Sequence, residues 1–255
     1  MNAAAAAFRM QLRLALRTPN YWMVQISTIP TVIIFLSVIE AFDRPDLLIN
    51  ALLAPILMAM WSTALWTGGS VVRDDRWMGR LELHAAAPTG YGLVVTARVA
   101  AVVMLSLLVV PLTLVTAWAT YGIDIRIAHP VVLVVALLLT AAAITGTGMI
   151  FSSLTILTRA AATFQSSASY PFLLLGGVFV PLSLLPVWVQ PLGRLVFLSW
   201  GSDLIRDSVT RPVVTGLPWR VAAIASLGSV GFIAAQRLVR VVLHRVKVTG
   251  EIAAP

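Results

Sequence analysis

The chain has 255 residues, of which 59% are hydrophobic and only 11% are charged, and its mean hydropathy is +0.93. A soluble domain usually carries about 25% charged residues, so a water-soluble globular fold is excluded and lipid must be the solvent for much of the surface. The net charge of +8 comes from arginines scattered between apolar runs, unlike the basic patch of a nucleic-acid-binding protein. The absence of cysteine excludes disulfides, thiolate metal sites and a cysteine nucleophile.

The first segment, residues 1–19, is predicted to be an amphipathic helix lying in the plane of the membrane surface. Pro19 ends its helical pattern. An arginine-edged helix of this kind faces anionic lipid headgroups. The alternative is that the segment merely extends the first membrane span. The apolar face and the neighbouring basic stripe consist of Phe8, Leu12, Ala15, Leu16 and of Arg9, Arg13, Arg17.

Six stretches between charged residues are candidates for membrane spans, which need about 20 mostly apolar residues. The last one is short, but Arg220 and Arg237 at its ends can extend toward the membrane surface. The arginine bias places both termini in the cytoplasm, because the segments on that side then hold most of the basic residues. A five-span arrangement would put the basic C-terminal cluster outside and is disfavoured. The six spans are residues 18–39, 47–72, 99–123, 127–158, 160–181 and 221–236.

A charged island, VVRDDRWMGRLELHAAAPTG, separates the second and third spans and contains residues 73–90. Asp74 or Asp75 can cap a helix start, and Pro88 and Gly90 can end that helix. We expect a short amphipathic cytoplasmic helix, with one face toward the membrane and the other toward a partner protein. An ordinary solvated loop is the alternative. The two faces would consist of Trp77, Met78, Leu81, Ala85 and of Arg76, Arg80, His84.

The fifth span carries mild polar groups in the stretch TFQSSASYP. Ser166, Ser169 and Tyr170 share one helical face, and Gln165 lies one step away. Such residues either form hydrogen bonds between helices or face a substrate or a second copy of the chain.

The region after the fifth span, residues 182–206, is apolar but too irregular to cross a membrane. Pro186 and Pro191 interrupt it, and Arg194 lies inside it. An irregular or re-entrant helical hairpin is therefore expected. Such backbone is tolerated at membrane depth only where it is buried in protein or lines a cavity.

Several activities are disfavoured by what the sequence lacks. The phosphate-binding motif GxxxxGK[ST] needs a lysine, and the only lysine is Lys247 in HRVKVTG. If the protein is powered by ATP, another subunit must supply the energy. The first five predicted spans contain no charged residue, which argues against an ion-gradient transporter. His84, His129 and His244 are far apart and no catalytic or metal motif is present, which argues against a membrane-embedded enzyme.

The stretch RDDRWMGRLELHAAAP resembles the motif [ED]R-E-x-G-T-L-E-x-L-x-x-x-P of ABC-2-type permeases, the membrane subunits of many bacterial ATP-binding-cassette exporters. It departs from the motif at Trp77, usually acidic, and at Arg80, usually threonine. The matching residues are Asp75, Arg76, Gly79, Leu81, Glu82 and Pro88. The resemblance implies that residues 73–90 are the coupling helix that docks into the ATPase subunit. The residues expected to act in this coupling are Arg73, Asp74, Asp75, Arg76, Trp77, Gly79, Arg80, Leu81 and Glu82.

A second stretch, GVFVPLSLLPVWVQPLGRLVFLSWGSDLIR, resembles the family pattern G-x-F-x-P-x-x-x-L-P-x-W that continues to a distant arginine. Leu198 stands where the family usually has proline. The resemblance implies an extracytoplasmic re-entrant hairpin. The matching residues are Gly177, Phe179, Pro181, Leu185, Pro186, Trp188 and Arg206.

The resemblance implies one all-α integral membrane domain over residues 1–255, with six transmembrane helices, an N-terminal interfacial helix, a cytoplasmic coupling helix and the re-entrant hairpin. It implies two copies of a separate ATPase, which binds ATP and Mg²⁺, and a second permease, identical or paralogous. The chain itself would need no cofactor or metal. The expected location is the bacterial plasma membrane, in contact with its lipids. The closest-looking group, the daunorubicin-type exporters, suggests an amphipathic drug, natural product or lipid as substrate; polysaccharide or glycolipid export is the alternative.

Overall fold

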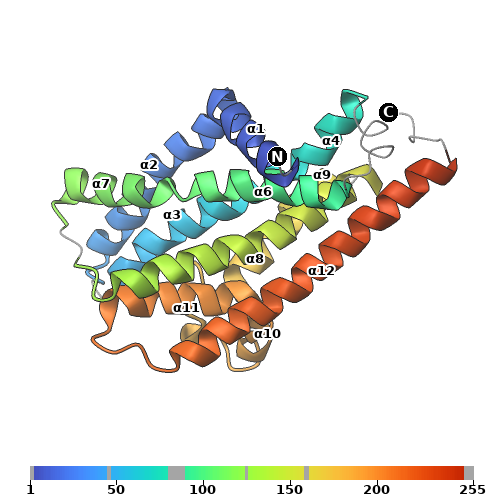
Figure 1. The fold of residues 1–255 in the computed structure, drawn as a ribbon. Coiled ribbons are helices and arrows are strands. Elements are labelled where there is room, and N and C mark those ends of the chain that lie inside the picture. The colour runs from blue at the N-terminus through green and yellow to red at the C-terminus, as the bar shows by residue number, and fades with distance from the viewer. Residues whose placement is uncertain (1–2, 45–46, 80–89, 124–125, 158–160, 250–255) are drawn as a thin grey trace.

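The computed structural model describes residues 3–44, 47–79, 90–123, 126–157 and 161–249, and among these residues every regular element is a helix. The helices pack as a bundle (Figure 1). The elements are α1 (Ala3–Arg17), α2 (Pro19–Ala41), α3 (Leu48–Thr63), the π-helix η2 (Ala64–Gly68), α4 (Gly69–Trp77), α6 (Tyr91–Ser106), α7 (Val109–Tyr121), α8 (Pro130–Leu157), α9 (Ala161–Leu175), the 3₁₀ helix η3 (Leu182–Leu184), α10 (Gln190–Arg194), α11 (Phe197–Thr210) and α12 (Leu217–Thr249).

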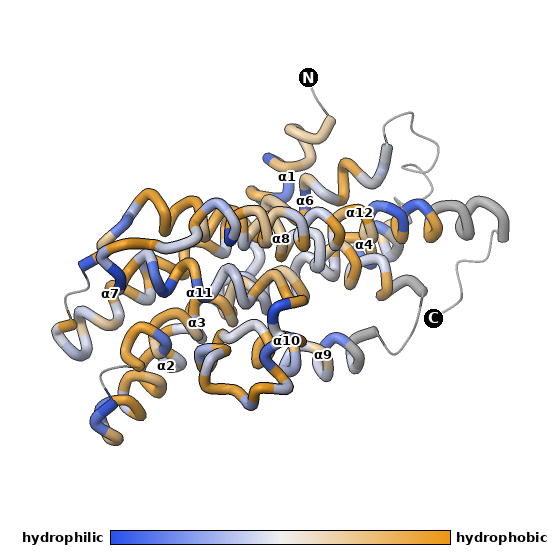
Figure 2. Tube along the Cα trace, turned by 90° about the horizontal axis from the view of Figure 1, so that it is seen from below, coloured by the Kyte–Doolittle hydropathy of each residue, from blue (hydrophilic) through white to orange (hydrophobic). Residues whose placement is uncertain are grey.

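Five helical stretches of the described chain are long and apolar enough to cross a membrane. Figure 2 shows apolar residues along most of the chain, with hydrophilic residues confined to short patches. An all-α integral membrane fold is therefore confirmed. The five stretches are Tyr21–Ala41, Leu48–Asp75, Tyr91–Tyr121, Pro130–Leu154 and Leu217–Val242.

The remaining predicted span, residues 160–181, coincides with α9, which ends earlier than predicted. Its 15 residues make a helix of about 22 Å, shorter than the hydrocarbon core of about 30 Å. The prediction of six spans is therefore not established by helix length. In Figure 1, the ends of α4, α8 and α12 and the starts of α6 and α9 gather at one end of the bundle, to the right. We call this the α4 end.

The second and third spans are both longer than the uncharged runs that predicted them. The second continues from α3 through η2 and α4 to Asp75, and the third begins at Tyr91, eight residues earlier than predicted. The longer stretches include Arg73, Asp74, Asp75 and Arg98, so the prediction that the first five spans carry no charge does not hold for the spans with these bounds. Asp75 and Arg98 can be buried there because the two charges pair with each other, as described below.

The predicted helix start at Asp74 or Asp75 was also wrong, because both residues lie near the end of a helix. The backbone stays helical from Leu48 to Trp77. Gly79 then has φ +64, the left-handed conformation that commonly follows a helix and that glycine adopts without a steric penalty. The expected coupling helix falls mainly on residues 80–89, which lie outside the described residues.

Helix α1 confirms the N-terminal helix, but its buried face differs from the predicted apolar face. Ala7, Gln11 and Ala15 are buried and pack toward α6. Leu16, which was predicted on the apolar face, is exposed together with Leu14. The small residues allow close packing on α6, which leaves the larger apolar side chains on the outer side of α1.

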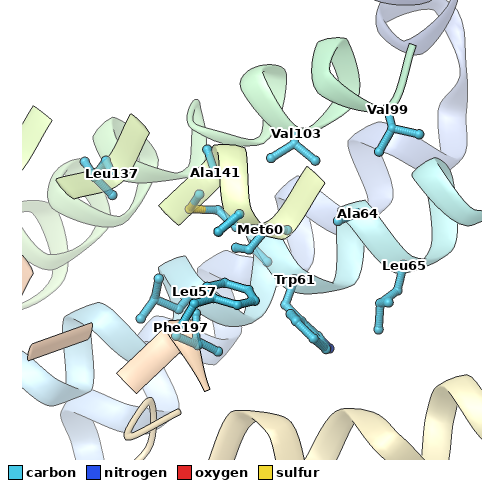
Figure 3. Packing of buried hydrophobic residues seen from close by; sticks show 14 of the residues in the cluster. Leu57, Met60, Trp61, Ala64, Leu65, Val99, Val103, Leu137, Ala141 and Phe197 are labelled. Carbon is cyan, nitrogen blue, oxygen red and sulfur yellow. The ribbon is translucent and has the colours of Figure 1, made fainter. Parts of the chain in front are cut away.

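The core of the bundle is built around α3, whose residues are buried on nearly all sides. Trp61 stacks on Phe172 of α9 with ring centroids 5.3 Å apart. A Cβ added to Gly228 of α12 would lie 2.8 Å from the Cβ of Ala143, so these two helices need a glycine at their contact. Side chains of α3, α6, α8 and α11 meet in this core. Figure 3 shows, among others, Leu57, Met60, Trp61, Val99, Val103, Leu137, Ala141 and Phe197.

Candidate functional site

A buried ion pair joins the two helices that border residues 78–90. Nη1 of Arg98, in α6, lies 2.6 Å from Oδ2 of Asp75, in α4. Arg98 is only 3% exposed and Asp75 only 1%. The hydroxyl of Tyr91, the first residue of α6, donates a second hydrogen bond of 3.1 Å to the same carboxylate oxygen. The end of α4 and the start of α6 are thus held together by charge.

The same arginine reaches the N-terminal helix. Nε of Arg98 donates a hydrogen bond of 2.8 Å to Oε1 of Gln11 in α1. Burial of a charge is costly unless it is paired and hydrogen-bonded, and here both charges are. We call Gln11, Asp75, Tyr91 and Arg98 the α1–α4–α6 network.

Some of the predicted coupling residues are buried and others are exposed. Asp75, expected to take part in docking an ATPase, is buried in the α1–α4–α6 network. The side chains of Arg73 and Asp74 are about half exposed, and Trp77 is 81% exposed. Arg80, Leu81 and Glu82 lie outside the described residues, as does the side chain of Arg76. Among the described residues, the accessible part of the predicted set is therefore Arg73, Asp74, Trp77 and Gly79.

Arg98 was not recognised as a member of this site. It stands 23 residues from Asp75 in the sequence, and no periodicity connects the two. One signal was available: between Glu82 and Asp124, Arg98 is the only residue among aspartate, glutamate, lysine and arginine. An isolated charge in an apolar run needs a partner.

Apart from the α1–α4–α6 network, a second group of predicted residues lies where the chain reverses its direction after α9. Gly177 has φ +63 and follows Gly176, where an added Cβ would lie 2.8 Å from the carbonyl oxygen of Phe172. The last carbonyls of a helix have no partner within it. Here the Ser202 hydroxyl donates to the carbonyl of Gly176 at 2.7 Å, and Nη2 of Arg206 donates to the carbonyl of Gly177 at 3.1 Å.

Arg206 also connects this turn to the centre of the bundle. Its Nε donates a hydrogen bond of 2.5 Å to Oδ1 of Asn50 in α3, and its Nη1 lies 2.8 Å from Asp203. Burial lowers the pKa of Arg206, and this effect is larger than the opposite effect of the Asp203 carboxylate. An arginine pKa starts so far above neutral that the charge is kept. Arg206 therefore fastens the turn at Gly177 to α3 and α11.

The other residues of the re-entrant pattern build the hairpin itself. Phe179 stacks on Phe35 of α2, with centroids 6.5 Å apart. Pro181 precedes η3. The carbonyl of Leu185 accepts a hydrogen bond from Gln190 at 3.0 Å. The carbonyl of Pro186 accepts the backbone N–H of Val189 at 2.8 Å. Trp188 is 75% exposed. The hairpin of residues 182–206 thus contains η3, α10 and the first part of α11, and of these pattern residues Pro186 and Trp188 are exposed.

The polar face predicted on α9 has a buried part and an exposed part. Gln165 is buried and its amide nitrogen donates to the carbonyl of Leu65 in η2. Ser169 is partly buried and its hydroxyl donates to the carbonyl of Gln165 at 2.7 Å. Ser166 is exposed and Tyr170 is 70% exposed. Gln165 therefore attaches α9 to the π-helical segment, and the exposed residues face outward.

Sequence reasoning missed two members of this exposed stripe. Thr163 and Ser167 are also exposed on α9, at helical spacing from Ser166 and Tyr170. Trp66, next to the Leu65 carbonyl, is exposed as well. We call Thr163, Ser166, Ser167 and Tyr170 the polar stripe of α9. Within the described part of the chain, no three histidine or acidic side chains cluster as a metal site would require.

The chain is similar to one family of known proteins. No curated protein gives a match to the chain. The model of the ABC-2 type transporter family matches residues 3–209, a range that includes α1, the α1–α4–α6 network, the polar stripe of α9 and the hairpin of residues 182–206. The match covers well over half of the chain, and the chain belongs to the ABC-2 type transporter family.

Proposed function

We propose that this chain is the permease subunit of an ABC exporter, which moves an amphipathic drug, natural product or lipid outward. A separate ATPase, in two copies, binds ATP and Mg²⁺ and supplies the energy, and a second permease, identical or paralogous, completes the membrane part. The chain itself carries no catalytic role. It lies in a bacterial plasma membrane with the α4 end and both termini in the cytoplasm.

The observation that carries this proposal is the α1–α4–α6 network. Residues 78–90 join α4 to α6, and the buried pair of Asp75 and Arg98 holds the two flanking helices together. A force applied to this segment by an ATPase is therefore transmitted to both spans at once. Gln11 adds α1 to the moving unit, so that the interfacial helix follows the spans.

The substrate route is proposed to run along the polar stripe of α9. The phenol hydroxyl of Tyr170, whose side chain is 70% exposed, is unfavourable against lipid, because hydrocarbon offers it no hydrogen-bond partner. A second copy of the chain, or an aqueous route between two copies, removes that cost. Tyr170 adds an aromatic surface with a polar end, which suits an amphipathic substrate.

The experiment is reconstitution of the permease with its ATPase in liposomes and measurement of ATP hydrolysis and drug export. The Glu82→Lys substitution reverses a charge in the predicted docking segment. We expect the complex to remain assembled while ATP hydrolysis stops responding to substrate and export is lost.

The matched control is Glu40→Lys, because Glu40 lies at the end of α2 on the opposite side of the bundle and undergoes the same change of charge. It should leave both activities unaltered. Export driven by an ion gradient from the permease alone, with no ATPase present, would refute the proposal.

A further inference from the structure

A groove of about 560 Å³ lies on the side of the bundle formed by α6, α8 and α12. Helix α8 lies between the other two in Figure 1. The volume falls within the range of about 300–1000 Å³ that small-molecule sites occupy. The groove is separate from the α1–α4–α6 network and from the polar stripe of α9. Its lining includes Met104 of α6, Leu139 and Ala142 of α8, and Ala225, Ser229 and Ile233 of α12.

The groove is present because many of the side chains that line it are small, while direct contacts hold the surrounding helices together. Gly228 packs on Ala143, and Gly146 packs on the backbone of Phe232, so α12 lies in close contact with α8. Between α6 and α12 the amide nitrogen of Gln236 donates a hydrogen bond of 2.8 Å to the hydroxyl of Thr96. From this bond toward the opposite end of the bundle, the space between the two helices is lined mainly by apolar groups.

The length of the groove matches one leaflet of a bilayer. Its lining on α12 runs from Ile224 to Ile233, which is about 14 Å along the helix axis. The hydrocarbon core of a bilayer is about 30 Å thick, so half of it is about 15 Å. All three helices are membrane spans, and Met104 and Ile233 are exposed. An acyl chain has both the polarity and the length to lie there.

Two arginines continue the groove toward the α4 end. Arg237 and Arg240 lie four and seven residues after Ile233, which places them on the same helical stripe. Both are exposed, and no acidic side chain among the described residues pairs with either. Side chains on a helix lean toward its N-terminus, which for these arginines is the direction of the groove.

The order of chemistry along this stripe is apolar groove, then the amide of Gln236, then two guanidinium groups. An anionic phospholipid has the same order: acyl chain, ester carbonyls and phosphate. Neutral lipids lack the net negative charge that two unpaired arginines favour. A second copy of the chain would bring no such order of groups, and its polar stripe on α9 requires a different surface.

We propose that the groove between α6, α8 and α12 binds an anionic phospholipid, with one acyl chain along Ala142 and Ala225 and the phosphate on Arg237 and Arg240. The bound lipid would complete the packing between α6 and α12. This site is independent of the substrate and of the direction of transport.

The test uses the full-length permease, delipidated in detergent and then incubated with dioleoylphosphatidylglycerol or dioleoylphosphatidylcholine. Native mass spectrometry counts the lipids bound to each chain. The wild-type protein should bind one phosphatidylglycerol in preference to phosphatidylcholine. The double substitution R237Q/R240Q should weaken phosphatidylglycerol binding about 30-fold, since each arginine near a lipid headgroup contributes about a factor of five.

The Ala225→Phe substitution fills the groove from an exposed position and should abolish binding at the site. Ala222→Phe is its control, because Ala222 is exposed on the same helix but does not line the groove. R126Q/R211Q is the control for charge, because both arginines are exposed and neither lines the groove. An unchanged melting temperature of the lipid-free variants would show that they fold. Equal phosphatidylglycerol binding by R237Q/R240Q and wild type, or by A225F and A222F, would overturn the proposal.

Discussion

Arg98 and Asp75 form a buried ion pair of 2.6 Å between the helix that enters residues 78–90 and the helix that leaves them. The pair does more than neutralise two charges, because Tyr91 and Gln11 complete its hydrogen bonds from a helix start and from α1. Four residues from three helices, α1, α4 and α6, thus meet beside the predicted ATPase-docking segment.

Arg98→Ala should destabilise the protein strongly. It leaves the Asp75 carboxylate buried without its cationic partner, and breaking a buried pair in this way costs about 3–5 kcal/mol. The melting temperature of the purified permease measures the effect. The double variant D75L/R98M should recover much of the loss, because it removes both charges. Arg73→Ala is the control, since its contact with Asp74 is 4.0 Å long and half exposed; a loss as large as that of Arg98→Ala would contradict this account.

Arg206→Lys should destabilise the hairpin of residues 182–206 although it keeps the positive charge. A lysine ammonium cannot reproduce the planar fork that bonds Asn50, Asp203 and the Gly177 carbonyl together. Loss of a hydrogen bond to a charged group costs about 1.5–3 kcal/mol. Chemical or thermal unfolding checks this, with Arg211→Lys as the comparison, because Arg211 pairs with Asp207 from an exposed position. Equal stability of the two variants would refute the bridging role of Arg206.

Gly177→Ala should lower the free energy of unfolding by about 1–2 kcal/mol, the usual penalty of the left-handed conformation for a residue with a Cβ. The φ of +63 that Gly177 adopts is required for the chain to turn after α9. Gly231→Ala provides the contrast, because Gly231 is helical and an added Cβ would meet nothing within 4 Å. That variant should be neutral or stabilised by up to about 1 kcal/mol. Thermal unfolding of both variants would distinguish strain from a general effect of added volume.

Tyr170→Cys should produce disulfide-linked dimers in membranes under mild oxidation, if the polar stripe of α9 faces a second permease. The chain contains no other cysteine, so the background is absent and any linked species reports position 170. Disulfides require Cα atoms within about 7 Å, which makes the result specific. Val131→Cys, equally exposed at 74% but on α8, should remain monomeric on a non-reducing gel. Efficient linkage at 131 and none at 170 would place the interface elsewhere.

The spans and their breaks were predictable because each depends on a local pattern. Runs of apolar residues predicted helices α2 and α8 and the start of α3 to within a few residues, and Pro186 and Pro191 predicted the irregular hairpin. Gly79 and Gly177 matched the family motifs, but the left-handed turns at both residues were not predicted. The helix boundaries near Asp75 and Arg98 were misplaced, because a charge was taken to mark the end of a span.

Sequence alone therefore determined that lipid surrounds much of the chain, that the fold is helical and which segments resemble a permease. These conclusions depend on hydropathy and periodicity, which are properties of neighbouring residues. Only the tertiary structure decided that Asp75 turns inward to Arg98 and that Arg206 holds the carbonyl of Gly177. It also decided that Gln165 is buried beside Leu65 while Tyr170 is exposed. Each of these outcomes depends on a partner far away in the sequence, and the cost of burying an unpaired polar group selects that partner only when the helices have packed.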